Sequence, residues 1–361
     1  MMSFARLGNE LYFGRRSFKI VENRRRWLSV AGFFVVASII IILVRGLTLG
    51  VEFSGGSEFR AENVTSTDAD IAIEVLAEAG VSDVPRVSTI GENAVRIQTS
   101  EADSSQIESL RQALMEAYGT EQISSTFIGP AWGQDVTRSA LSGMAIFLPL
   151  VALGMVMYFR TWTMSLGAVT ALLHDLIVTV GVYALVGFEV TPASVIGFLT
   201  ILGYSLYDTV VVFDKVRENT ATHFEQDRIT YVEASDLAVN QTMVRSINTS
   251  VTGLLPVGAI LFVGATGLGA GTLRDISLAL FVGMFVSTFS SIFVAAPAEA
   301  EFRMRVSRYK EHTQSVMAKR ESNEDLVAVD STSAAALGAT VVSGTHKGHT
   351  AQPRKKSRRN R

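Results

Sequence analysis

Six long apolar runs dominate the pattern of hydrophobic and polar positions along the chain. A helix needs about 20 apolar residues to cross the hydrocarbon core of a bilayer, and each run comes close to that length. The runs lie at 27–44, 139–159, 164–187, 190–213, 247–268 and 273–297. The pattern therefore predicts a polytopic α-helical membrane protein with six transmembrane helices, and it argues against a soluble enzyme.

The segment between the first two runs alternates between strand and helix periods. The expected elements are a strand at 50–62 broken at Gly55 and Gly56, a helix at 68–79, strands at 84–90 and 94–99, a helix at 105–118 and a strand at 123–128. This β-α-β-β-α-β order is that of a ferredoxin-like α+β domain. The segment has no histidine and no acidic pair with catalytic spacing. We interpret it as a docking domain. The alternative is a small domain that only covers the membrane part.

The net charge of −2 hides three blocks of opposite sign. Residues 1–26 carry 7 basic and 2 acidic side chains (+5), residues 48–138 carry 5 and 15 (−10), and residues 303–361 carry 13 and 5 (+8). Basic flanks of membrane segments stay on the cytoplasmic side. We therefore expect both termini in the cytoplasm and the acidic segment outside.

These boundaries divide the chain into five parts. The expected parts are a cytoplasmic basic N-terminus at 1–26, a first transmembrane helix at 27–47, the extracytoplasmic α+β domain at 48–138, five further transmembrane helices at 139–302 with a cytoplasmic loop at 214–246, and a disordered basic tail at 303–361. The tail is expected to bind anionic lipid, at about 1 kcal/mol per basic residue near the surface. Its basic end has no interleaved aromatic residues, so no specific nucleic-acid contact is expected.

Several kinds of site are not expected from the composition. The chain has no cysteine, which excludes disulfides and thiolate chemistry, and its five histidines do not cluster as a metal site would require. A glycine-rich stretch at 264–272 lacks the lysine of a phosphate-binding loop. We therefore predict no metal and no cofactor, and any energy input must come from another source.

Three ionisable residues stand well inside the apolar runs, namely His174, Asp175 and Asp208. A charge at the bilayer centre costs about 2.5–3.5 kcal/mol even on a lenient scale, so such residues need a reason. One interpretation is a proton relay, because a buried acid with a movable cationic neighbour can take up and release protons. The other, which applies chiefly to the pair in the third run, is a packing network of hydrogen bonds. Its expected partners are Tyr204, Ser205 and Thr209.

Arg245 is the best candidate for the movable cation. It lies at the inner mouth of the fifth run and shares one helical face with Gln241, Asn248 and Thr249 by i, i+4 and i+3 spacing. The alternative for Arg245 is an ordinary positive anchor at the cytoplasmic surface. An intramembrane aspartyl protease would need a second aspartate in a Gly-x-Gly-Asp setting, which the chain lacks.

Three motifs in the chain resemble those of a known family, the SecF subunits of SecD–SecF protein-export complexes. The stretch 203–219, GYSLYDTVVVFDKVREN, resembles the most diagnostic one, and 240–250 resembles the next. The stretch 50–56, GVEFSGG, resembles the signature that follows the first span. The residues carried over as motif positions are Glu52, Phe53, Gly55, Gly56, Gly203, Tyr204, Asp214, Arg217, Asn240 and Gln241.

The resemblance implies one half of a resistance-nodulation-division type assembly in the bacterial cytoplasmic membrane. It implies SecD, the SecYEG channel and YidC as partners, unfolded preproteins as cargo and the proton-motive force as the driving energy. Asp208 falls on the proton-carrying aspartate of the family and Arg245 on its helper arginine. Tyr207 and Glu52 depart from the usual Asn and Asp. The alternative function is a proton-coupled transporter of a small molecule or lipid, as in related architectures.

Overall fold

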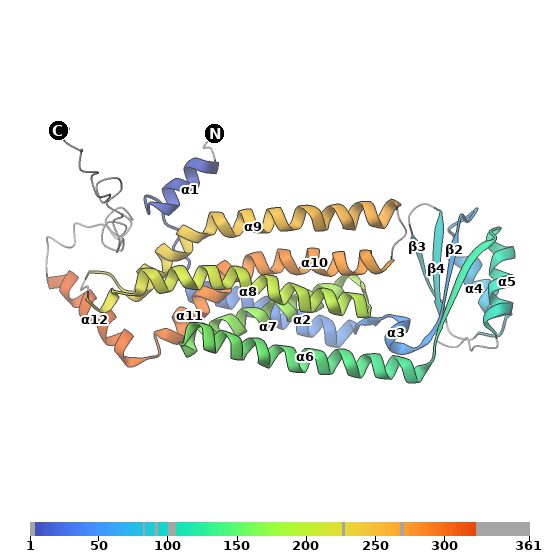
Figure 1. Ribbon diagram of the computed structural model, residues 1–361, viewed down its shortest axis with the longest axis horizontal. Coiled ribbons are helices and arrows are strands. Elements are labelled where there is room, and N and C mark those ends of the chain that lie inside the picture. The colour runs from blue at the N-terminus through green and yellow to red at the C-terminus, as the bar shows by residue number, and fades with distance from the viewer. Residues whose placement is uncertain are drawn as a thin grey trace, which may run out of the picture.

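The structure, a computed structural model, describes residues 4–81, 84–90, 93–99, 106–225, 228–267 and 271–322. Six stretches of helix are long and apolar enough to cross a membrane, which confirms the predicted class. They run side by side in one elongated bundle (Figure 1). These helices are α2 (Arg24–Arg45), α6 (Pro130–Phe159), α7 (Trp162–Val186), α8 (Pro192–Thr220), α9 (Tyr231–Gly267) and α10 (Gly271–Ser290), the last continued by α11 (Ala296–Arg303).

The last span is continuous but irregular. Between α10 and α11 the backbone makes a π-helical turn over Ser291–Ala295. Pro297 then lies at the start of α11, directly after this turn, and its missing N–H leaves one backbone bond of the continuous helix unmade. A π-turn widens the helix locally and changes the direction of the side chains beyond it. This change turns the end of the last span into the bundle, where Glu299 is buried.

The α+β domain follows the predicted order and lies at the far end of the bundle from α12 (Ser307–Ser322) (Figure 1). The elements are β2 (Gly56–Glu62), α4 (Ala69–Glu78), β3 (Arg86–Ile90), β4 (Ala94–Thr99), α5 (Ile107–Tyr118) and β5 (Gln122–Ile128). The strands form one sheet in the order β3-β4-β2-β5, with every neighbouring pair antiparallel. This topology confirms the ferredoxin-like prediction.

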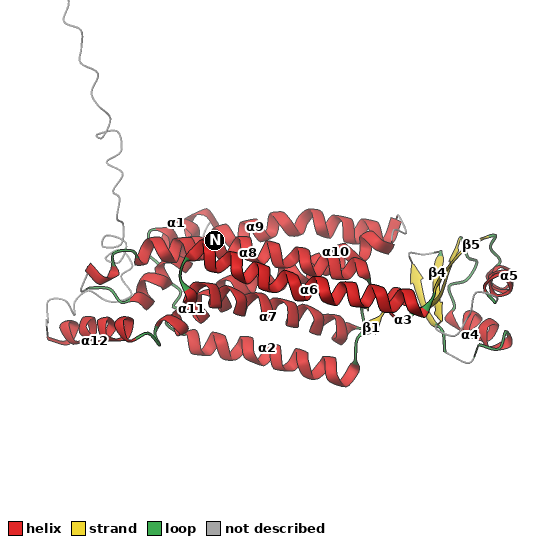
Figure 2. Ribbon diagram, turned by 60° about the horizontal axis from the view of Figure 1, so that its bottom comes forward, coloured by secondary structure: helices red, strands yellow, loops and turns green. Residues whose placement is uncertain are grey.

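The sheet of this domain has two faces with different tasks. Phe59 and Ile97 pair across β2 and β4 and are buried with Leu76 and Leu114 beneath the two helices. Successive side chains of a strand point to opposite faces. The intervening positions of β2 and β4 therefore point away from α4 and α5, toward the membrane bundle (Figure 2). Most of those positions are polar, namely Glu58, Arg60, Glu62, Arg96 and Gln98.

One predicted strand is wrong at its beginning. The structure has a helical turn, α3 (Val51–Ser54), where a strand from 50 was expected, and β2 starts only at Gly56. Gly55 ends the turn at φ +77°, and Gly56 follows at φ +131°, backbone regions that glycine tolerates best. A further short pairing precedes the turn, since β1 (Thr48–Leu49) lies parallel to β6 (Glu189–Val190) between α7 and α8.

The segments expected in the cytoplasm are more ordered than predicted. Most of the expected loop 214–246 is helical, because α8 continues to Thr220 and α9 begins at Tyr231. The N-terminal segment contains α1 (Phe4–Tyr12), and the tail expected to be disordered starts with α12. Helices end at caps and turn residues, not where hydrophobicity ends, so apolar runs underestimate helix length. The rest of the tail, 323–361, and residues 268–270 of the glycine-rich stretch lie outside the described residues.

Close packing of α8 against α10 depends on two glycines. A Cβ atom at Gly197 would lie 2.5 Å from Cβ of Ala279, and one at Gly283 would lie 2.7 Å from Cγ1 of Ile201. Small residues let helices approach closely where lipid offers no hydrophobic driving force between them. These contacts hold α8, which carries Asp208, in a defined position.

We predict that Gly197→Val separates α8 from α10 and lowers the free energy of unfolding by about 1–3 kcal/mol, as overpacking usually does. Thermal unfolding of the purified protein in detergent measures the effect. Gly154→Val is the matched control, because no atom lies within 4 Å of a Cβ placed at Gly154. Equal melting temperatures for the two variants would contradict the prediction.

Candidate functional site

The pair His174 and Asp175 lies on α7 and is buried in the bundle. The side chain of Asp175 is fully buried, at 0% exposure. Its Oδ1 lies 3.1 Å from Nδ1 of His174, and its Oδ2 accepts a hydrogen bond of 2.6 Å from Ser205 of α8. Ser205 was among the partners expected for a packing network. Both carboxylate oxygens of Asp175 therefore have partners, which links α7 to α8.

Asp208 lies one helical turn beyond Ser205 and faces α9. It is 3% exposed, and its Oδ1 accepts a 2.8 Å hydrogen bond from Ser246. Its Oδ2 is buried and has no hydrogen-bond partner among the described residues. Buried polar atoms are nearly always paired, so an orphaned carboxylate oxygen calls for a functional or solvent-based explanation. Asp208 is thus a buried acid with one unpaired acceptor oxygen. It is not alone in this, since Nε2 of His174 and the hydroxyls of Thr179 and Ser287 are also buried and unpaired among the described residues.

Arg245 is not brought to Asp208. It is exposed, and among the described residues it forms no hydrogen bond or ion pair. The face of α9 that meets α8 carries Ser246 and Ser250, the latter 3.5 Å from the hydroxyl of Tyr204. Consecutive helical residues point about 100° apart, so Arg245 faces away when Ser246 faces Asp208. Sequence spacing therefore placed Arg245 at the same level as Asp208 along the bundle, but the structure puts it on a different face of α9 from the one that meets α8.

Asn240 and Gln241 hold the N-terminal segment against α9. Asn240 Oδ1 accepts a 2.8 Å hydrogen bond from the Phe18 N–H, and Gln241 donates one of 3.1 Å to the Tyr12 carbonyl. Asp236, which sequence reasoning did not select, accepts bonds of 2.6 and 2.9 Å from the N–H groups of Val21 and Glu22. These contacts give the motif residues a positioning role at this end of the bundle.

The remaining motif positions of α8 lie on its surface or between helices. Gly203 is exposed, and a Cβ there would meet no atom within 4 Å. Asp214 and Arg217 are also exposed, and Asp214 accepts a 2.9 Å hydrogen bond from the Tyr158 hydroxyl of α6. None of these residues contacts Asp208 or Asp175. The structure therefore divides the sequence motif into a buried polar part and a surface part.

A cluster of charged residues joins the α+β domain to the membrane bundle. Arg96 of β4 pairs with Glu58 of β2 at 2.6 Å and with Glu189 of β6 at 2.8 Å. Gln98 donates hydrogen bonds to both glutamates, at 3.1 and 2.7 Å. We call Arg96, Glu58, Gln98 and Glu189 the junction cluster. It belongs to the polar face of the sheet, and sequence reasoning missed it because its members are up to 131 positions apart.

Glu52 of the Gly-Gly signature lies next to the junction cluster. Its Oε2 is buried without a hydrogen-bond partner among the described residues. Burial raises the pKa of Glu52, its own backbone N–H counteracts this, and the nearby carboxylate of Glu189 raises the pKa further. Phe53 points the other way and packs with the buried residues around Tyr183. The signature therefore contributes one carboxyl group and one apolar contact at the base of the domain.

A second buried ion pair lies at the opposite end of the bundle and was also missed. Glu299 accepts hydrogen bonds from Arg303 at 2.9 Å and from the Tyr231 hydroxyl at 2.8 and 2.9 Å. Both ionic residues are nearly inaccessible. Glu299 stands two positions past the sixth apolar run, so a search confined to the runs overlooks it. The i, i+4 spacing of the pair on one helix was the available signal.

This fold and these sites define a class: a six-span membrane protein with a ferredoxin-like domain and carboxyl groups buried between its central helices. Two models of one protein family match the chain. The model described as "Protein export membrane protein SecD/SecF, C-terminal" matches residues 109–305, and the "SecD/SecF GG Motif" model matches 40–62. The chain belongs to the SecD/SecF family of protein-export membrane proteins and has an accessory role in Sec-dependent export.

Curated relatives agree with this assignment. The chain is 42% identical to the protein translocase subunit SecF of Streptomyces coelicolor, over 89% of this chain and 86% of that protein. It is 41% identical to SecF of Mycobacterium tuberculosis, over 87% and 73%.

Solved structures of a larger relative share the fold. The chain resembles the crystal structure of SecDF, a translocon-associated membrane protein from Thermus thermophilus, with a TM-score of 0.71 and 26% identity. The likeness covers 80% of this chain and 39% of that one. A second structure, of SecDF in a super-membrane-facing form, gives a TM-score of 0.59 at 28% identity over 82% and 40% of the two chains.

We predict that Arg96→Gln loosens the junction, because it leaves two partly buried carboxylates without their counter-ion. The amide of Gly50 donates to the Val190 carbonyl at 2.9 Å and reports on this contact. Its hydrogen exchange should accelerate about tenfold, between the effects of an exposed and a fully buried pair. Arg111→Gln removes an ion pair within α5 and should leave this amide unchanged. Equal exchange in the two variants would count against the cluster as a clamp.

The raised pKa of Glu52 predicts a pH dependence of stability. The folded state binds this proton more tightly than the unfolded chain does, whose value is near 4.5. The stabilising contribution is therefore complete below that value and is lost as the pH rises through the folded pKa. Glu52→Gln, which mimics the protonated form, should raise the melting temperature relative to wild type more at pH 8 than at pH 4. The same difference at both pH values would refute the assignment.

Proposed function

We propose that this chain couples proton flow through the membrane to the movement of its α+β domain, and thereby promotes outward translocation of preproteins. Its role is mechanical and not enzymatic. The observation that carries the proposal is Asp208, a buried acid with one vacant acceptor oxygen at the contact of α8 and α9. Ionisable residues buried in membrane helices commonly mark proton paths.

Asp208 is proposed as the residue that takes up and releases the proton. One oxygen is held by Ser246, which fixes the carboxyl group, while the other is available to a proton or a water molecule. A neutral acid is cheaper to keep in an apolar bundle than a charged one. Protonation would therefore change which helix arrangement is favoured. A change of this kind is what a proton-driven cycle needs.

Arg245 and the pair on α7 have supporting roles in this proposal. Arg245 lies one position from Ser246, so a rotation of α9 would bring the cation toward Asp208 and favour its charged form. His174 and Asp175 remain candidates for the relay, and the hydrogen bond that Asp175 accepts from Ser205 also ties α7 to α8. Two arrangements of α9 would thus correspond to two protonation states of Asp208.

A short path of direct contacts connects this site to the α+β domain. The helices α7 and α8 carry Asp175 and Asp208, and the short segment that joins them contains Glu189 of the junction cluster. A shift of α7 against α8 would therefore move the partner of Arg96. The domain is tied to the same segment by the β1–β6 pairing. This path would transmit a change in the bundle without a long flexible linker.

The partners follow from the family and its topology. We propose SecD as the second half of the assembly, because the Thermus thermophilus relative is a SecDF protein of which this chain matches 40%. The assembly would act at the SecYEG channel, with YidC as a further neighbour and anionic lipid as a contact of the basic tail. We also propose that both termini lie in the cytoplasm, on the basis of the basic flanks.

The test is preprotein translocation in inverted membrane vesicles that contain SecD and this chain, with the proton gradient present or collapsed. Asp208→Asn should abolish the gradient-dependent part of export, because asparagine is nearly isosteric but carries no titratable proton. Insertion and binding of SecD should persist, since the packing is preserved.

Asp135→Asn on α6 is the matched control, because it makes the same change at an exposed position. It should leave the response to the gradient intact. A normal response in the Asp208→Asn variant would refute the relay role of Asp208. The proton path would then have to use Asp175 or the partner subunit.

A further inference from the structure

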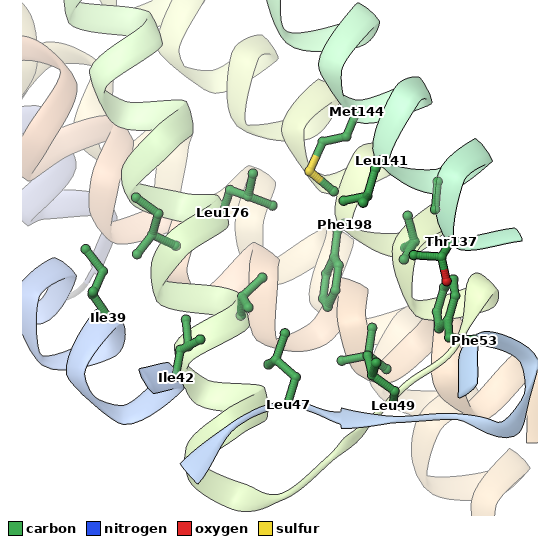
Figure 3. Close-up of a pocket in the computed structure, with 15 residues that line it drawn as sticks. Ile39, Ile42, Leu47, Leu49, Phe53, Thr137, Leu141, Met144, Leu176 and Phe198 are labelled. Carbon is green, nitrogen blue, oxygen red and sulfur yellow. The ribbon is translucent and has the colours of Figure 1, made fainter. Parts of the chain in front are cut away.

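An apolar groove lies between α2 and α6 at the end of the bundle that carries the α+β domain. Its volume is about 370 Å³, within the roughly 300–1,000 Å³ range of ligand sites. The helices α7 and α8 form its floor, and the segment around β1 and α3 closes one end (Figure 3). Ile39 and Leu141 are 41% and 62% exposed, so the groove opens sideways between the two outer helices.

The groove continues into a second hollow along α6, whose lining mixes polar and apolar residues. Phe53, Thr137 and Leu141 line both, and the second hollow adds Gln134 and Arg138. The residues of α6 that face the two hollows recur at i, i+3 and i+4 spacing, so they form one stripe along the helix. Arg138 is exposed and has no hydrogen-bond or ion-pair partner among the described residues. An apolar slot thus ends at an unpaired cation.

The depth of this arrangement matches a membrane surface. The apolar run of α6 begins at 139, directly after Arg138, and its 21 residues span about 31 Å as a helix. That length corresponds to the roughly 30 Å hydrocarbon core. Arg138 therefore stands where the hydrocarbon ends and lipid headgroups begin, and the groove runs inward from it. The α6 residues before Arg138 extend beyond this boundary toward the α+β domain.

The lining favours a flexible chain over a packed helix. Helices that dock in membranes use small residues at their contact so that the backbones approach closely. This groove is instead lined mainly by bulky side chains, including Ile42, Leu176 and Phe198 (Figure 3). A narrow slot between such side chains suits a hydrocarbon chain that can bend to fill it.

We propose that the groove and Arg138 together bind one anionic glycerophospholipid in the leaflet next to the α+β domain. An acyl chain occupies the groove between α2 and α6, and the phosphate of the headgroup lies against the guanidinium of Arg138. Phe53 lines both hollows and belongs to the Gly-Gly signature at the base of the domain. The bound lipid therefore fills the space between α6 and the segment that carries this domain.

Native mass spectrometry of the full chain with phosphatidylglycerol or phosphatidylcholine tests the site. Wild type should retain one phosphatidylglycerol, and Arg138→Gln should weaken that binding about fivefold, the factor for one headgroup contact with a basic residue. Ala140→Phe, which fills the groove, should reduce binding of both lipids. Arg160→Asn at the other end of the same helix is the matched control for loss of one positive charge and should bind like wild type.

Two outcomes would overturn the proposal. Equal phosphatidylglycerol binding by wild type, Arg138→Gln and Ala140→Phe would mean that lipid association is non-specific. The second outcome is that a helix of the partner subunit, and not a lipid, occupies the groove. Because the chain has no cysteine, Leu141→Cys introduces a single thiol at the groove for crosslinking in membranes that contain SecD. A disulfide to single cysteines along a SecD transmembrane helix would show that protein, not lipid, covers the groove.

Discussion

The burial of carboxyl groups between α7, α8 and α9 is the constraint on which the rest of the structure depends. A bilayer supplies no water to solvate Asp175 or Asp208, so neighbouring helices must supply the hydrogen bonds. Ser205 and Ser246 do so from two different helices. The three helices are therefore held in one register, and the glycines that let α10 approach α8 complete this packing. The serines that pair the carboxyl groups and the glycines that allow close packing thus act on the same group of helices.

The same constraint is met incompletely at several buried polar atoms, and among the described residues of the spans Asp208 is the carboxylate concerned. Asp175 has partners for both oxygens, whereas one oxygen of Asp208 has none among the described residues. An unpaired carboxylate is the most costly of these groups, because burying a charge costs more than burying a neutral polar atom. A proton on this carboxyl group, or a neighbouring cation, would each lower the cost of its burial.

At the junction with the α+β domain, by contrast, the charges of the junction cluster have counter-ions. There the charges are paired directly, with Arg96 between two glutamates. The backbone pairing of β1 with β6 adds a second contact beside them. Partly buried ion pairs have defined geometry even where their net contribution to stability is modest. The domain is thus joined to the α7–α8 connection by contacts that orient it. This segment links the bundle to the domain in addition to the direct passage of the chain from β5 into α6.

The sequence by itself determined the local features of this protein. The six spans, the order of the ferredoxin-like domain and the presence of buried acids all follow from residue spacing along single elements, because periodicity reports which face of one element is apolar. Only the tertiary structure decided which faces meet. It placed Ser246 and not Arg245 against Asp208, joined Arg96 to Glu189 across 93 positions, and opened a groove between α2 and α6. Such contacts depend on how helices rotate and pack, and no local period encodes that.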